Sequence, residues 1–258
     1  MTFTGAVGAA CMYPLRMIIR ACVALKIHPN TLTLIGYLIN VAAAFALGYG
    51  HFIRAGVIII IANIFDMIDG KVAHELQLQS QFGAFWDSTL DRLSDLALLT
   101  GLIFLYSKLG RSDYVMVASL ALIFSIMTSY ARARAESLVE KCKVGFMERP
   151  ERIVLFMIGS LTNRMAAVLW VILVLSILAV ANRIYYTYLA LNRLPMPTRN
   201  GVAGIFNRAL FWTDERTTIP YDLWVIAILS FVWLTPPDWL GDPTATGPGL
   251  IGLLTSAF

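Results

Sequence analysis

Apolar segments recur along most of the chain and are separated by short polar stretches. After a break at Pro29, they cover approximately residues 31–49, 53–75, 83–107, 113–140, 147–162 and 165–191. As α-helices, most of these segments are long enough to cross a bilayer core of roughly 30 Å. The pattern therefore predicts an all-α membrane protein with six transmembrane helices and short connections.

The segment before the first of these helices has a different pattern. Within residues 12–27, apolar side chains such as Leu15 and Ile19 alternate with Arg16 and Arg20, and the two arginines lie one helical turn apart. A helix with one apolar and one basic face is typical of a membrane surface. We therefore expect an N-terminal interfacial amphipathic helix.

The end of the chain is less regular than the rest. Leu223–Thr235 is apolar but too short to span a bilayer comfortably, and a stretch rich in Gly and Pro follows at residues 241–252. We interpret residues 1–194 as the transmembrane domain and residues 195–258 as an irregular C-terminal extension with interfacial or re-entrant helices.

Composition supports a membrane protein and excludes a soluble globule. Of the 258 residues, 58% are hydrophobic and only 14% are charged, whereas soluble domains are about half apolar. Of the 18 Lys and Arg residues through residue 200, four fall in the loops on one side, which are Arg54, Lys108, Arg111 and Arg164. The basic side should be cytoplasmic, and its charge fits lipid headgroups better than nucleic acid.

The cysteines give no sign of a disulfide framework. Cys11, Cys22 and Cys142 are few and widely separated, and they lack the spacing of a zinc site. We expect ordinary buried thiols.

Four carboxylates interrupt the second and third apolar segments. Asp66 and Asp69 are three residues apart, and Asp87 and Asp91 are four apart, so each pair can project from one helical face. A lone carboxylate within a bilayer costs on the order of 3 kcal/mol, and antiparallel neighbouring helices could bring both pairs together. A single Asp could equally form an interhelical hydrogen bond or ion pair, and we assign such a supporting role to Asp95.

Four converging carboxylates would repel one another unless cations bind between them. Ligation by oxygen alone suits Mg²⁺ or Mn²⁺, and a pair of such ions can stabilise the attacking and leaving oxygens of phosphoryl transfer. The small residues Gly70, Ala73 and Gly83 would let a nucleotide approach the backbone. A cation transporter is an alternative from a different functional class, since it too could place carboxylates between helices.

The same residues form a motif. The pattern DxxDGxxA, followed by GxxxDxxxD from Gly83, resembles the signature of the CDP-alcohol phosphotransferase family. One position departs from that signature, because His74 stands where the family usually has Arg. This substitution should weaken the hold on the nucleotide diphosphate and make it sensitive to pH.

The resemblance implies a six-helix membrane enzyme, usually a homodimer, in the bacterial inner membrane with its active site facing the cytoplasm. It implies that Asp66, Asp69, Asp87 and Asp91 bind two divalent ions, Mg²⁺ or Mn²⁺, and that Asp91 is also the catalytic general base. By the same resemblance, the residues around the CDP-lipid headgroup are Asn30, Thr31, Leu32, Thr33, Gly70, Ala73, His74, Ser80 and Gly83.

A basic group after the fourth segment indicates the acceptor. Arg132 lies inside the helical pattern, and with Arg152 and Arg183 it could form a cationic pocket facing the carboxylates. Guanidinium groups suit a phosphate monoester, so the acceptor should be a phosphorylated alcohol.

The runs SYARARAE and ERPER also resemble the phosphatidylinositol phosphate synthase branch of the family. This resemblance implies transfer of the phosphatidyl group of CDP-diacylglycerol to inositol phosphate, with the three arginines holding the acceptor phosphate. A phosphatidylglycerophosphate synthase, or another CDP-alcohol phosphotransferase, is the alternative, because a basic pocket recognises phosphate before it recognises the polyol.

Overall fold

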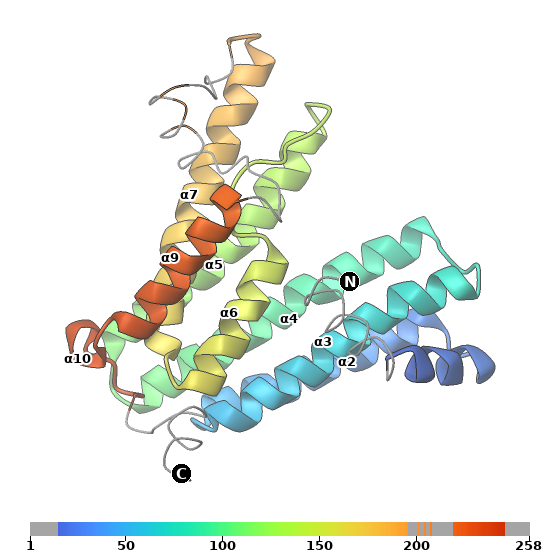
Figure 1. Cartoon of the computed structure of the whole chain (residues 1–258), viewed down its shortest axis with the longest axis horizontal. Helices are drawn as coiled ribbons and strands as arrows, with labels where there is room; N and C mark the ends of the chain where they lie inside the picture. The colour runs from blue at the N-terminus through green and yellow to red at the C-terminus, as the bar shows by residue number, and fades with distance from the viewer. Residues whose placement is uncertain (1–14, 196–200, 202–203, 205–206, 208–218, 246–258) are drawn as a thin grey trace.

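The computed structural model describes residues 15–195, 201, 204, 207 and 219–245. Each of the six predicted apolar segments forms one helix (Figure 1). They are α2 (Pro29–Gly48), α3 (Phe52–Glu75), α4 (Gln81–Lys108), α5 (Ser112–Glu136), α6 (Arg149–Thr162) and α7 (Met165–Leu191). Two more helices follow in the C-terminal part, α9 (Ile219–Leu234) and α10 (Pro237–Leu240).

Local sequence explains where several helices begin and end. At the start of α2, Pro29 has no N–H to satisfy, and Nδ1 of His28 accepts a hydrogen bond from the backbone N–H of Asn30 at 3.3 Å. The Ser80 hydroxyl caps α4 by accepting from the backbone N–H of Gly83 at 2.9 Å. Helix α6 ends at Asn163, whose φ of 55° lies in the left-handed region. These caps fix the ends of helices that border the carboxylates.

Among the described helices, α2, α5 and α7 are long and apolar enough to cross a membrane. Helices α3 and α4 contain the carboxylates, which lower their hydropathy, and α6 has only 14 residues. Helix α5 also ends at Glu136, four residues before the predicted end of its segment. The protein is therefore helical and membrane-bound, and the predicted total of six spans stays a prediction.

The helices form two groups, which contact each other directly through α4 and α5 and are also joined by α6 (Figure 1). Helix α2 packs against both α3 and α4, and α5 packs against α7. Helix α6 contacts α3 and α4 on one side and α7 on the other. Its first turn consequently faces the ends of α3 and α4 where the carboxylates lie.

Residues 15–24 are helical and amphipathic, as the sequence predicts. Leu15, Ile19 and Cys22 are buried against Leu32, Ile68 and Val72, whereas Arg16 and Arg20 are exposed. The apolar face thus covers α2 and α3, and its position at a membrane surface stays a prediction.

Cys22 and Cys142 are free and buried, as predicted, and Cys11 lies outside the described residues. Burial raises the pKa of the Cys142 thiol, which lies in the loop after α5. This thiol therefore stays protonated and unreactive near neutral pH.

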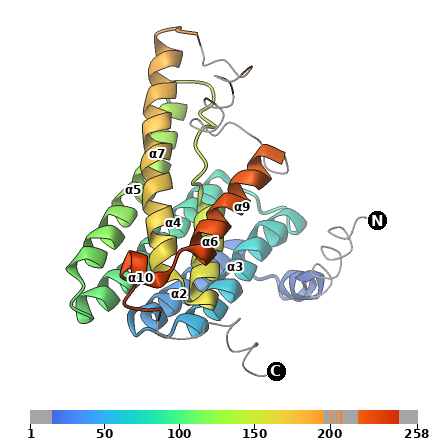
Figure 2. The same ribbon diagram turned by 60° about the vertical axis from the view of Figure 1, so that its left-hand side comes forward.

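The C-terminal helices pack against the preceding helices. Helix α9 lies beside α6 and α7, and α10 contacts α7 (Figure 2). Helix α9 begins at Ile219, four residues before the predicted start. The predicted turn at residues 241–252 lies outside the described residues beyond residue 245, and an interfacial or re-entrant position for this extension stays a prediction.

The contact between α2 and α4 gives a test of the fold. A Cβ on Gly101 would collide with the carbonyl oxygen of Ala44 and lie 3.0 Å from its carbonyl carbon. We expect Gly101→Ala to lower the melting temperature in detergent, at a cost of about 1–3 kcal/mol, because the two backbones must separate. The exposed Thr100→Ala on the same helix is the control, and equal melting temperatures for the two variants would contradict this packing.

Candidate active site

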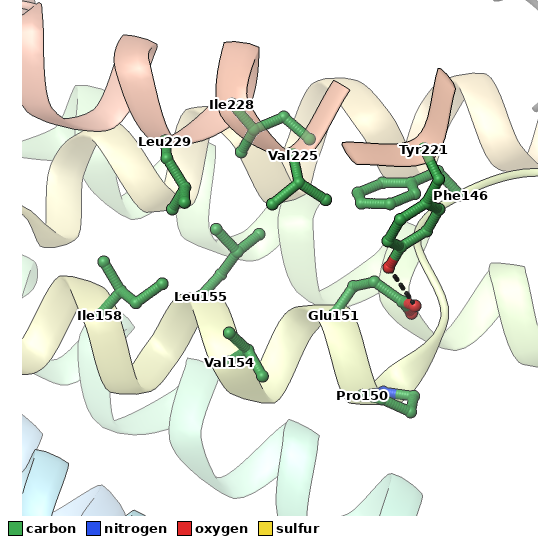
Figure 3. Close-up of a pocket in the computed structure, with 10 residues that line it drawn as sticks. All are labelled: Phe146, Pro150, Glu151, Val154, Leu155, Ile158, Tyr221, Val225, Ile228 and Leu229. Atoms are coloured by element: carbon green, nitrogen blue, oxygen red, sulfur yellow. Dashed lines mark hydrogen bonds between the residues drawn. The ribbon is translucent and has the colours of Figure 1, made fainter. Parts of the chain in front are cut away.

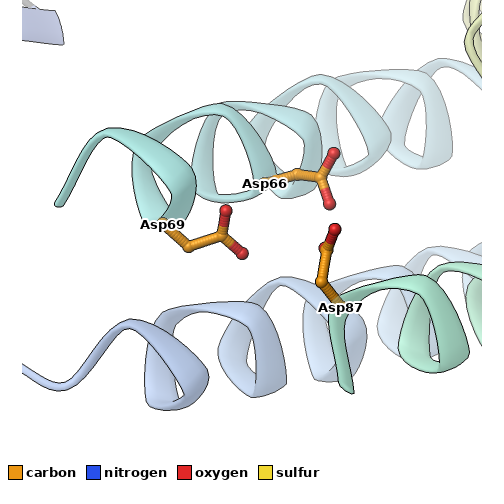
Figure 4. A group of neighbouring side chains, drawn as sticks. All are labelled: Asp66, Asp69 and Asp87. Carbon is orange, nitrogen blue, oxygen red and sulfur yellow. The ribbon is translucent and has the colours of Figure 1, made fainter. Parts of the chain in front are cut away.

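Three carboxylates converge between α3 and α4. Asp66, Asp69 and Asp87 each offer a carboxylate oxygen, and these oxygens lie within 4.8 Å of one another. Figure 4 shows the three side chains pointing into a common space from two facing helices. Three negative groups this close repel one another, and a set of oxygen ligands of this kind fits a divalent cation such as Mg²⁺ or Mn²⁺.

Asp91 lies beside this group and forms an ion pair with Arg149 of α6. Nη1 of Arg149 lies 2.9 Å from an oxygen of Asp91 and 2.9 Å from an oxygen of Asp66. One guanidinium therefore joins the predicted base to a carboxylate of the cluster. Asp66, Asp69 and Asp87 are the three most closely grouped carboxylates. Asp91, the fourth predicted ligand, lies next to them, and Arg149 bridges Asp91 and Asp66.

Asp69 is the most deeply buried of the three clustered carboxylates and has a neutral partner. The Thr33 hydroxyl on α2 donates to Oδ2 of Asp69 at 2.7 Å. This bond orients one carboxylate oxygen and leaves the other available to a cation. Thr33, which the resemblance assigns to the lipid headgroup, thus contacts the carboxylate cluster directly.

The predicted headgroup positions gather around the ends of α2, α3 and α4. A Cβ on Gly83 would lie 3.2 Å from Oγ of Ser80 and 3.5 Å from Oδ1 of Asn30, so these three residues are neighbours. A Cβ on Gly70 would meet nothing within 4 Å. Protein packing therefore leaves open space at Gly70, next to Asp69.

The remaining headgroup positions differ in exposure. Thr31 and His74 are exposed and Ala73 is half-buried. Leu32 is 2% exposed and packs in the core with Ile68 and Val72. Its side chain therefore supports α2 and does not face a ligand.

The three predicted acceptor arginines come together around Glu148 and Thr128. Nη1 of Arg132 lies 2.5 Å from Oε1 of Glu148, and Nη2 of Arg183 lies 3.9 Å from the same oxygen. Arg152 donates to the Thr128 hydroxyl at 3.2 Å, and Arg183 donates to the Thr128 carbonyl. Residues from α5, α6 and α7 thus form one basic cluster.

Arg152 and Arg183 are both 2% exposed and have protein partners. Nη2 of Arg152 lies 2.6 Å from Oδ2 of Asp95 on α4, and Nε donates to the same oxygen at 3.0 Å. Arg183 donates from Nε to the Val144 carbonyl at 3.0 Å. The supporting role predicted for Asp95 is therefore an ion pair with Arg152 of the neighbouring helix α6.

Arg149 and Glu148 were not assigned a role from the sequence. In the sequence Arg149 belongs to a stretch rich in positive charge, and charge runs at helix ends are usually lipid anchors. The signal that favours Arg149 is electrostatic, since four carboxylates require a nearby cation and Arg149 begins the helix facing them. Glu148 has no comparable signal, because its contacts are with Arg132 and Arg183, which lie on two other helices.

Residues 26–192 match the CDP-alcohol phosphatidyltransferase family, and the chain belongs to this family. An archaetidylinositol phosphate synthase of Pyrococcus horikoshii is 38% identical over 67% of this chain and 89% of its own length. A phosphatidylinositol phosphate synthase of Mycobacteroides abscessus is 31% identical over 61% of this chain and 76% of its own length.

Solved structures support the same assignment. The phosphatidylinositol phosphate synthase of Mycobacterium tuberculosis with CDP-DAG bound has a TM-score of 0.65 and 25% identity, covering 71% of this chain and 98% of that chain. The same enzyme in complex with manganese and citrate has a TM-score of 0.64 and 27% identity, covering 73% and 96%. The protein is a membrane enzyme of this family, and its carboxylate cluster is consistent with use of a divalent metal.

The Asp95–Arg152 pair gives a prediction about stability. Asp95→Ala leaves the buried Arg152 guanidinium without its counter-ion, which typically costs about 3–5 kcal/mol. We expect a clear fall in the melting temperature of the purified protein. Asp113→Ala is the matched control, since it breaks an ion pair with Arg111 in which the Asp113 side chain is 58% exposed. Equal effects of the two substitutions would contradict a structural role for the buried pair.

Proposed function

We propose that this enzyme transfers the phosphatidyl group of CDP-diacylglycerol to inositol phosphate, giving phosphatidylinositol phosphate and CMP. The observation that carries the proposal is the joining of two clusters by the segment 148–152. Arg149 contacts Asp66 and Asp91. In the same segment, Glu148 contacts Arg132 and Arg152 contacts Thr128. This segment thereby holds side by side the carboxylates that we assign to the metal and the arginines that we assign to the acceptor phosphate.

The names of the relatives support the acceptor. The synthases from Pyrococcus and Mycobacteroides are named for different lipids, but both names contain inositol phosphate. The donor is supported by the Mycobacterium structure that contains CDP-DAG. Glycerol phosphate, the alternative acceptor, has no such support among these relatives.

On the donor side, we assign Asp66, Asp69, Asp87 and Asp91 to the binding of two divalent ions, with Mg²⁺ the expected metal and Mn²⁺ also suitable. Such ions would neutralise the diphosphate and stabilise the departing CMP. Thr33 orients Asp69, and the open space at Gly70 gives the headgroup access to the backbone. The exposed His74 is assigned to the diphosphate.

On the acceptor side, Arg132, Arg152 and Arg183 hold the phosphate of inositol phosphate. Asp91 accepts the proton of the inositol hydroxyl, and the resulting oxygen attacks the lipid-side phosphorus. A new P–O bond forms as the bond to CMP breaks. Arg149 orients the Asp91 carboxylate for this step, since their side chains are 2.9 Å apart.

The setting of the enzyme is also part of the proposal. Excess positive charge on one side of the predicted helices favours an active site that faces the cytoplasm. We further propose a location in the bacterial inner membrane and a homodimeric assembly, both of which rest on the family resemblance.

A direct assay of CMP release tests the function. Purified protein in detergent is mixed with CDP-diacylglycerol, Mg²⁺ and either inositol phosphate or glycerol phosphate. We expect release with inositol phosphate, little with glycerol phosphate, and loss of at least tenfold when EDTA removes the metal. Release with glycerol phosphate alone would overturn the choice of acceptor, and full activity in EDTA would overturn metal-dependent catalysis.

The role of Asp91 gives a second prediction. Asp91→Asn retains the size of the side chain but cannot accept the proton, so kcat should fall by about 10²-fold or more. Binding of CDP-diacylglycerol, measured separately by isothermal titration calorimetry, should remain detectable. Activity close to that of the wild type would exclude Asp91 as the base.

A further inference from the structure

Helix α9 lies beyond the residues that match the family, yet it contacts the segment that carries the catalytic cluster. Near its start, the Tyr221 hydroxyl donates to Oε1 of Glu151 at 3.3 Å. The Tyr221 ring also packs against Phe146, with centroids 5.5 Å apart. Figure 3 shows both contacts at one end of the space between α6 and α9. Tyr221 therefore contacts the chain on both sides of Glu148 and Arg149.

The far end of the extension is also fixed to the transmembrane helices. The Tyr114 hydroxyl on α5 donates to the Leu240 carbonyl at 2.6 Å. The buried Asn163 side chain at the end of α6 donates to the Thr244 carbonyl at 3.0 Å. These bonds anchor the extension, so that Tyr221 is presented by a helix held at its other end.

Between the two ends, the contact is incomplete. A cavity of about 360 Å³ lies between α6 and α9, lined mainly by aliphatic side chains such as Leu155 and Ile228 (Figure 3). At the start of these helices, Tyr221 contacts Glu151 and Phe146 directly. A substitution at Tyr221 should therefore change the position of the first turn of α6 more than that of the rest of the fold.

From these contacts we propose that Tyr221 is a positioning residue for the acceptor site. Its hydroxyl contacts Glu151 and its ring contacts Phe146, so the chain between these two residues keeps Glu148 in place. Glu148 in turn contacts Arg132 and lies near Arg183. The C-terminal extension thus tunes acceptor binding from outside the family's matched region. This inference rests on the proposed function.

Tyr221→Phe tests the proposal, since it removes the hydroxyl and keeps the ring against Phe146. We expect the KM for inositol phosphate to rise by about tenfold, whereas the KM for CDP-diacylglycerol and the melting temperature stay near wild-type values. Tyr188→Phe is the matched control, because Tyr188 is exposed on α7 and 57% accessible. An unchanged acceptor KM, or equal rises in both KM values, would overturn the proposal.

A double-mutant cycle identifies the route of the effect. Glu151→Ala should raise the KM for inositol phosphate as Tyr221→Phe does, and the double variant should have a KM no higher than that of either single variant. Glu151→Gln keeps an oxygen that accepts the Tyr221 hydrogen bond, so its KM for inositol phosphate should stay close to the wild-type value. Additive effects would overturn the proposed contact. Absence of transfer to inositol phosphate by the wild-type enzyme would instead refute the proposed function, so the two failures are distinguishable.

Discussion

The structure depends on the placement of charged groups among apolar helices. Asp66, Asp69, Asp87 and Asp91 lie on helices that otherwise pack through aliphatic side chains, where an uncompensated carboxylate is expensive. The fold compensates this cost in part through Thr33 and Arg149. The remaining negative charge attracts a divalent cation, and this need connects the packing of the helices to their chemistry.

Helix α6 is the element through which this compensation is organised. It is short, and its first turn supplies Arg149 to the carboxylates and Arg152 to the basic cluster. Because the two arginines are three residues apart on one helix, one turn carries contacts to both the carboxylates and the basic cluster. The buried pair of Arg152 with Asp95 further joins α6 to α4.

The C-terminal extension adds a second set of contacts to the same turn. The Mycobacterium synthase is matched over 98% of its length and 71% of this chain, and the family match ends at residue 192, before the extension begins. Tyr221 contacts this part of the chain through Glu151 and Phe146. These contacts come from a segment outside the residues that match the family.

The sequence by itself determined the helical segments and the residue types of the site. Hydrophobic runs predicted all six helices, since length and apolarity are local properties, and the spacing of the aspartates indicated a metal-binding face. Only the tertiary structure decided that Arg149 joins Asp66 to Asp91, that Asp95 neutralises Arg152, and that Leu32 faces the core. It likewise decided that Tyr221 reaches Glu151 across 70 residues of sequence. These contacts join helices far apart in the chain, and their partners are selected by packing geometry, which no local pattern of residues encodes.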